Sequence, residues 1–249
     1  MPALFSSHPP LSCSRALPIL HRTSSILHPT SHPFHSPPLP PFHSSLLHHA
    51  AAAPVPDALA LLLDRGGEAA ADLINKPDDA GWTPLLVAAA AGRARAVEIL
   101  LASGADPAAT TPQGRTALHY AASKADPAVI AALIAGGCDP NAKDKLGATP
   151  LHRAASADRL AAVRALLGAG AKPGAKDAHK QTPLAVASAA GARGPALVLA
   201  SSAGADLEAE DVDGETPLSL AAPHGGLRGA LAALAKGESD LAELLGEDR

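Results

Sequence analysis

Histidine is the side chain best suited to chemistry in this sequence, and most of its histidines lie before residue 57. Imidazole binds transition metals, and a His-rich tract can hold such an ion weakly. This stretch also has many prolines and no Asp, Glu or Lys to support bound ligands. We therefore expect adventitious metal affinity at most, with no metal site and no cofactor. The histidines concerned include His8, His28, His32, His35, His48 and His49.

The remaining reactive groups do not form a catalytic set. Glu208, Glu210 and Asp211 read as a solvated polar loop rather than as paired acid–base carboxylates. Cys13 and Cys138 match no zinc or redox spacing, which favours a reducing compartment. We also find no Gly-rich phosphate loop after a strand, and no nucleophile with a base and an orienting group. We predict that the protein is not an enzyme.

The charge and apolar patterning of the chain argue against two further classes. The 249 residues carry a formal net charge of −4, whereas contacts to phosphates require a basic surface. No apolar run free of charge and proline reaches about 18 residues, the length of a membrane span. We therefore expect neither a nucleic-acid partner nor a membrane span.

The body that follows the His-rich leader is built from small aliphatic side chains. All three phenylalanines precede residue 45, so Trp82 and Tyr120 are the only aromatic residues after it. Long alanine runs favour helix because alanine loses no side-chain entropy on ordering. A β-core would draw on more aromatic and β-branched residues. The composition predicts an all-α fold.

A threonine, followed by alanine or proline and then leucine, recurs along this body. The units begin "GWTPLLVAAAAGR", "GRTALHYAASKAD", "GATPLHRAASADR", "KQTPLAVASAAGA" and "GETPLSLAAPHGG". Their spacings are 33, 33, 33 and 34 residues, and such a period indicates a stacked array rather than a single globule. The threonines are Thr83, Thr116, Thr149, Thr182 and Thr216.

Each part of the unit has a structural reason. Threonine caps the first helix, and proline suits its first position, where no N–H is needed. We expect His119 and His152, three residues after their threonines, to bond to neighbouring backbone groups. Apolar residues spaced by three and four form one face of the second helix, which ends at a left-handed glycine. These glycines are Gly104, Gly137, Gly170 and Gly204.

The second helices have start signals as well. Asp126 followed by Pro127 predicts a cap and a first helical residue. We expect Pro195 to start a helix in the same way after a one-residue insertion, which explains the spacing of 34.

The pattern TPLHxAA at a period of 33 residues resembles the ankyrin repeat. This resemblance implies an all-α ankyrin-repeat solenoid of about six stacked helix-turn-helix units, with β-hairpin-like fingers between them. We place the repeat domain at 45–244, after a leader at 1–44 and before a tail at 245–249. The units lie near 45–78, 79–111, 112–144, 145–177, 178–211 and 212–244.

The stretch "SLLHHAAAA" from residue 45 aligns with the start of a unit, with Ser45 in place of threonine. Downstream, "DALALLLDRG" supplies a second helix, and about five inserted residues in "GEAAADLINKP" lengthen the spacing to 38. We expect this stretch to belong to the fold. The residues that keep the register are Leu47, His48, Ala50 and Ala51.

Several explanations fit the leader. Its Ser-rich, acid-free composition is typical of a plastid transit peptide, and its proline runs can form polyproline II for an SH3-like groove. It can also be translated upstream sequence that replaces a true first repeat. Because the leader meets a repeat without a linker, we favour a misjoined or diverged N-terminus, with plastid import as the alternative localisation.

Four phrases within the repeats are closer to one family. They resemble the gankyrin family, the non-ATPase subunit 10 proteins of the proteasome regulatory particle, in the same repeat order from about residue 45 to 222. The resemblance implies a monomeric, cytoplasmic and nuclear chaperone for assembly of the 19S base. Its concave face would hold the C-terminal domain of a proteasomal ATPase subunit. The phrases are "DDAGWTPL" at 78–85, "AAAAGR" at 88–93, "TALHYAASK" at 116–124 and "LHRAA" at 151–155.

The resemblance also implies which residues contact the acidic ATPase domain. Basic residues in an otherwise acidic body would steer such a partner. Two departures are the count of six units instead of seven, and the absence of an LxCxE motif, so tumour-suppressor binding is not carried over. The alternative is an ankyrin-repeat signalling or organelle-targeted adaptor with an unrelated partner. The contact residues are Trp82, Arg93, Tyr120, Lys124, Arg153 and Arg159.

Overall fold

The computed structural model describes residues 46–124, 126–237 and 241–246. Contacts divide the chain into two units, Met1–Pro33 and Phe34–Arg249, and every described residue lies in the second. The described part contains thirteen helices and no strand, apart from an isolated bridge between Thr110 and Thr116. None of these helices is long and apolar enough to span a membrane. The predicted all-α repeat fold is confirmed.

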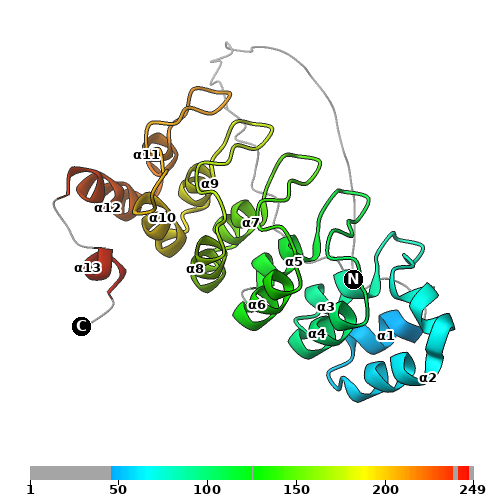
Figure 1. Ribbon diagram of the computed structural model, residues 1–249. Helices are drawn as coiled ribbons and strands as arrows, with labels where there is room; N and C mark the ends of the chain where they lie inside the picture. The colour runs from blue at the N-terminus through cyan, green and yellow to red at the C-terminus, as the bar shows by residue number, and fades with distance from the viewer. Residues whose placement is uncertain (1–45, 125, 238–240, 247–249) are drawn as a thin grey trace, which may run out of the picture. The chain divides into compact units, whose positions relative to one another are not determined.

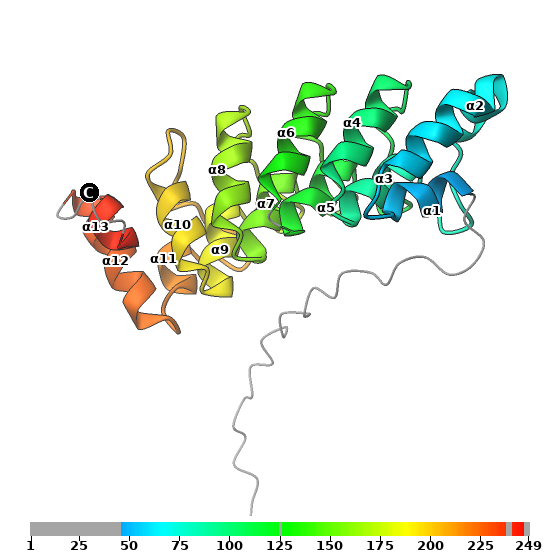
Figure 2. The ribbon, with the colours of Figure 1, turned by 90° about the horizontal axis from the view of Figure 1, so that it is seen from below.

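The helices alternate along the chain between two rows (Figures 1 and 2). Within each row, every helix packs against the next member of its row, and the last helix, α13 (Leu241–Leu245), packs against α10. The first row contains α1 (Leu46–Ala52), α3 (Pro84–Ala90), α5 (Ala117–Lys124), α7 (Pro150–Ser156), α9 (Pro183–Ala190) and α11 (Pro217–Leu220). The second contains α2 (Asp57–Ile74), α4 (Ala94–Ala102), α6 (Pro127–Ala135), α8 (Leu160–Gly168), α10 (Arg193–Ala200) and α12 (Gly225–Lys236).

The helix ends follow the capping residues that the sequence predicts. Thr182 shows the pattern: its Oγ1 accepts from the Ala185 N–H at 3.2 Å, and Pro183 fills the first helical position. The glycines after the second helices have the positive φ that suits glycine, which confirms that prediction. The φ values are 93° at Gly104, 87° at Gly137, 84° at Gly170 and 90° at Gly204.

Two local details differ from what the pattern suggests. α10 begins at Arg193, so Pro195 is its third residue, and the prediction that Pro195 starts this helix after a capping residue was wrong. The physical reason is that Ala192, at the N-cap, has no side-chain acceptor. The residues inserted in the first unit lengthen α2 to 18 residues. Gly67, with φ 48° and ψ −134°, interrupts that helix.

The core is a cluster of aliphatic side chains shared by both rows of helices. The leucine of the first four TPL or TAL motifs is almost fully buried, as Leu118 and Leu151 illustrate with 0% exposure, whereas Leu218 of the last motif is partly buried. Paired alanines such as Ala121 and Ala122 are also fully buried, and their small volume allows successive first helices to approach closely. Each unit therefore completes its core only against its neighbours.

Candidate protein-binding surface

Two histidines tie a first helix to the unit that follows it. Nδ1 of His119 accepts from the backbone N–H of Thr116 at 3.1 Å, so the ring proton is on Nε2. Nε2 then donates to the carbonyl of Ala148 at 3.0 Å, immediately before the next capping threonine. His152 repeats this arrangement one unit later, with Nε2 3.0 Å from the carbonyl oxygen of Gln181. The predicted backbone bonds of both histidines are confirmed.

His48 makes the equivalent contact from α1. Its Nε2 lies 2.8 Å from the carbonyl oxygen of Trp82, and Leu47, Ala50 and Ala51 are buried beside it. The stretch from residue 46 therefore belongs to the repeat array. Ser45, the expected replacement cap, lies outside the described residues.

Burial keeps the two bonded rings neutral. It lowers the pKa of His119 to about 4, because the charged form would lose its hydration. It also lowers the pKa of His152. At neutral pH both histidines are uncharged hydrogen-bonding groups within the fold.

The turn of each finger between units begins at a residue whose side-chain oxygen accepts hydrogen bonds from the backbone. Oδ1 of Asp144 accepts from the N–H groups of Leu146 and Ala148, at 2.9 and 3.0 Å. Thr111 replaces Asp in one finger and accepts from the Arg115 N–H at 3.4 Å. Such turns satisfy backbone donors locally. The same two bonds, to the residues two and four positions later, are made by Asp78, Asp177 and Asp211.

The residue nine positions after this acceptor reaches back to it in two units. The hydroxyl of Tyr120 donates to Thr111 Oγ1 at 3.4 Å, and the Tyr120 ring packs on Trp82 with centroids 4.6 Å apart. Arg153 pairs with Asp144 in the corresponding way. Tyr120 is 6% exposed and Arg153 is 8% exposed. These two of the six predicted contact residues therefore support a finger from inside the fold.

Asp144 receives two guanidinium groups. Its Oδ2 accepts from Arg153 Nη2 and lies 3.6 Å from Arg115 Nε. Burial by itself would raise the pKa of Asp144, but the hydrogen bond and charge of Arg153, with two backbone N–H groups, hold that pKa below its usual value. The carboxylate therefore stays ionised and links α7 to its finger.

Arg93 and Arg159 occupy equivalent positions, each just before a second helix. Nε of Arg93 donates to the carbonyl of Ala52 at the end of α1, at 3.1 Å. Nε of Arg159 donates to the carbonyl of Ser123, near the end of α5, at 3.2 Å. A cation suits a helix C-terminus because the last carbonyls are unsatisfied and carry the negative end of the dipole. Each arginine thus joins its unit to an earlier one.

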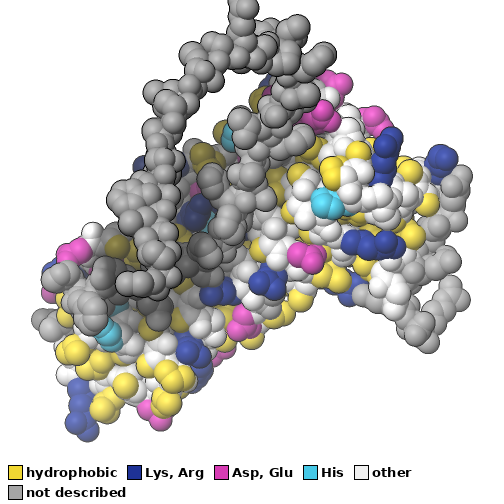
Figure 3. Space-filling model, turned by 180° about the vertical axis from the view of Figure 1, so that it is seen from behind, with side chains coloured by type: hydrophobic (Ala, Val, Ile, Leu, Met, Phe, Trp, Pro, Cys, Tyr) yellow, Lys and Arg dark blue, Asp and Glu magenta, His cyan; other side chains and the backbone are white. Residues whose placement is uncertain are grey.

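Lys124 is an exposed cation next to the contact made by Arg159. It is the last residue of α5, it is exposed, and it directly follows the serine that Arg159 contacts. Arg159 is also exposed, whereas Arg93 is half-buried. We call Arg93, Lys124 and Arg159 the basic row. On the face shown in Figure 3, Lys and Arg side chains stand at intervals among apolar and acidic ones.

The basic row is not continuous. Asp126 stands 33 residues after Arg93, at the equivalent position of the intervening unit. There its Oδ1 caps α6 by accepting from the Ala128 N–H at 3.0 Å. The structure therefore places Arg159 against the residue that precedes Lys124, and places Arg93 at the same position two units earlier.

A comparison with family models identifies the repeat. The model described as "Ankyrin repeats (3 copies)" matches residues 26–111 and 106–177, which together exceed half of the chain. The chain belongs to the ankyrin-repeat family. A search of curated proteins found no match. Ankyrin-repeat proteins are typically non-catalytic interaction scaffolds, and the repeats indicate that this chain is a protein-binding scaffold.

Outside the basic row, the ankyrin units offer little reactive chemistry. Within the described ranges, no group of three or more His, Cys, Asp or Glu side chains could hold a metal ion. Burial, with a contribution from the charge of Asp106, raises the pKa of the Cys138 thiol to about 11, so it stays protonated. Glu208 and Glu210 are exposed, whereas Asp211 forms a finger turn. Cys13 and most leader histidines lie outside these ranges.

Sequence reasoning missed two polar features of the ankyrin fingers. The turn acceptors all stand five residues before a capping threonine, so their period was visible. Asn75 and Asn141 each bridge two fingers: Nδ2 of Asn141 donates to the Gly170 carbonyl, and Oδ1 accepts from the Lys172 N–H. Both asparagines stand eight residues before a threonine. That shared position was the available signal.

Proposed function

We propose that this ankyrin-repeat protein is an assembly chaperone of the 19S regulatory particle base, which holds the C-terminal domain of one proteasomal ATPase subunit. The resemblance of "DDAGWTPL" and "TALHYAASK" to the gankyrin family supports the choice of partner. Cytoplasmic and nuclear localisation belongs to the same proposal. The role requires binding and release but no cofactor.

One observation carries this proposal furthest. The exposed side chain of Arg159 contacts the backbone of Ser123, the residue before the exposed Lys124, in a chain whose formal net charge is −4. An acidic partner would be attracted to this part of the surface and repelled by much of the rest. Trp82 and Arg93 are partly exposed and can add contacts at the edge. Tyr120 and Arg153 would act indirectly, by holding the fingers in place.

The direct test is binding of the purified full chain to the C-terminal domain of each proteasomal ATPase, measured by biolayer interferometry at two salt concentrations. We expect one domain to bind, with an association rate that falls as salt rises. Lys124→Glu combined with Arg159→Glu should weaken that binding about tenfold or more, mainly through the association rate. Binding to none of the domains by a folded chain would refute the proposal.

A matched control separates local charge from net charge. Lys145→Glu combined with Lys172→Glu makes the same change in net charge on exposed finger residues. We expect this control to keep most of the affinity. Equal losses in both double variants would mean that net charge alone drives association.

The alternative function is an organelle-targeted or signalling adaptor with an unrelated partner. The acid-free, Ser-rich composition of residues 1–44 favours it. Mass spectrometry of the protein purified from its native cells distinguishes the two. A mature chain that begins near residue 45 in a plastid fraction would support the adaptor, whereas a retained Met1 in the cytoplasm would support the chaperone.

A further inference from the structure

The first ankyrin unit exposes an unusual amount of apolar surface. α2 packs against α1 and α4, and Figure 2 shows no described helix on its other side. Leu61 is 50% exposed and Leu62 is 36% exposed, with Val55 at 56% just before the helix. Terminal units of repeat arrays normally present a polar outer face. An apolar outer face on the first described unit therefore indicates a surface that binds another protein segment.

The opposite end of the second row differs. α12, its last helix, has no large exposed hydrophobic residue, and its exposed side chains include Arg228 and Lys236. The following helix, α13, is held by a hydrogen bond from Arg193 Nη2 to the Leu244 carbonyl at 3.3 Å. Among the described helices, large exposed hydrophobic residues are thus confined to α1 and α2, in the first unit.

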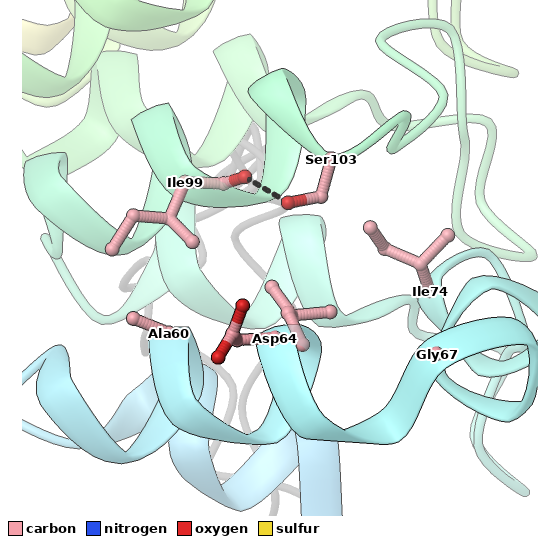
Figure 4. Close-up of a pocket in the computed structure, with 7 residues that line it drawn as sticks. Ala60, Asp64, Gly67, Ile74, Ile99 and Ser103 are labelled. Carbon is pink, nitrogen blue, oxygen red and sulfur yellow. Dashed lines mark hydrogen bonds between the residues drawn. The ribbon is translucent and has the colours of Figure 1, made fainter.

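α2 presents different stripes to α4 and to solvent. A pocket of about 430 Å³ lies between α2 and α4 (Figure 4). The residues of α2 that line it include Ala60, Leu63 and Asp64. Those residues follow helical spacing and so form one stripe. Leu61 is displaced from the middle of that stripe by about 100° around the helix axis. The stripe centred on Leu61 is therefore distinct from the surface that faces α4.

The stripe centred on Leu61 carries two opposite charges at equal distances from Leu61. Asp57 precedes Leu61 by four residues and Arg65 follows it by four, so all three lie near one line on the helix. All three are exposed. Among residues 46–124, 126–237 and 241–246, neither Asp57 nor Arg65 has a hydrogen-bonding or ion-pair partner through its side chain. The break at Gly67 comes after this stripe.

We propose that α2 pairs antiparallel with α2 of a second copy of this chain, about a two-fold axis at Leu61. Leu61 would then contact its counterpart, and Asp57 would lie opposite the partner's Arg65. Because the interface is isologous, Arg65 would lie opposite the partner's Asp57, so the ion pair forms twice. Antiparallel helices also oppose their dipoles favourably.

The residues of the proposed interface indicate how tightly the dimer associates and whether it depends on the proposed ATPase partner. The exposed apolar side chains are few, so the interface is at the small end of specific interfaces, and we expect a dissociation constant in the micromolar range. None of the three residues of the basic row belongs to α1 or α2. The dimer can therefore exist whether or not the proposed ATPase partner is correct. It would differ from the monomer that the sequence analysis predicts.

The test is sedimentation equilibrium of the full chain from about 5 to 500 μM, a range that brackets a micromolar dissociation constant. We expect a monomer–dimer equilibrium, weakened at least tenfold by Asp57→Arg or by Arg65→Asp. One variant then carries two cations on the stripe and the other carries two anions. An equimolar mixture of these variants should associate to within about threefold of the wild type. That recovery cannot come from misfolding.

The control is Arg95→Asp with the same sedimentation series, because Arg95 is an exposed residue of α4 that pairs with Glu98. We expect no change in dimerisation. A wild-type chain that stays monomeric at 500 μM overturns the proposal. So does a dimer whose dissociation constant is unaffected by either charge reversal, or a mixture that fails to associate.

Discussion

Nε2 of His119 lies 3.0 Å from the carbonyl oxygen of Ala148, the residue that immediately precedes the cap of the next ankyrin unit. The His119 imidazole therefore forms hydrogen bonds to the backbone before its own helix, α5, and to the backbone before α7, the first helix of the next unit. The contact requires a neutral ring, because Nδ1 must accept a hydrogen bond while Nε2 donates. Stability of the array is thereby linked to the protonation of its buried histidines.

We predict that the free energy of unfolding falls as the pH drops from about 6.5 towards 4. The folded pKa of His119 is about 4 and that of His152 is also lowered, so the unfolded chain binds these protons first. Each histidine contributes a loss of up to about 1.4 kcal/mol per pH unit in this window. Urea unfolding at several pH values measures it.

A control for this pH dependence uses an exposed histidine. His179→Gln changes a finger residue whose side chain is exposed, and we expect it to leave the pH profile nearly unchanged. His119→Gln should lower stability at pH 7 and flatten the profile. A free energy that is constant between pH 7 and pH 5 would contradict the linkage.

The parts of the fold that were predictable depend on residues close together in sequence. Thr182 and its bonded N–H are three residues apart, and Thr116 and His119 have the same separation. The exposure of Tyr120 and Arg153 depends instead on the finger residue nine positions earlier, so the motif alone did not show that they are buried. Likewise, the apolar run containing Leu61 resembles a core segment in the sequence, and only the structure shows that none of the described units covers it.

Arg153→Met should destabilise the protein by about 3 kcal/mol, because it removes the main partner of the buried Asp144 carboxylate. Adding Asp144→Asn should recover part of that loss, since the unpaired charge then disappears. A double-mutant cycle by urea denaturation measures the coupling. Additive losses would mean that the two side chains do not interact.

Tyr120 provides a test of structural against binding roles. Tyr120→Ala should cost about 3 kcal/mol through lost packing, and it should alter the fluorescence of Trp82, which lies 4.6 Å away between ring centroids. Tyr120→Phe removes only the 3.4 Å bond to Thr111 and should cost less than about 1 kcal/mol. If Tyr120→Phe abolishes partner binding while stability is kept, the hydroxyl is a direct contact.

The end of α6 packs closely against α4, and this contact can be tested by the stability of a glycine variant. A Cβ added at Gly136 would stand 3.0 Å from Leu101 Cγ and still closer to one of its methyl groups. Gly136→Ala should therefore destabilise by about 1 kcal/mol, since the leucine must move. Gly229→Ala in α12 meets no atom within 4 Å, so it should stabilise by about 0.5–1 kcal/mol through helix propensity. Thermal unfolding of both variants measures the contrast, and equal shifts would show that the α4–α6 contact is looser than described.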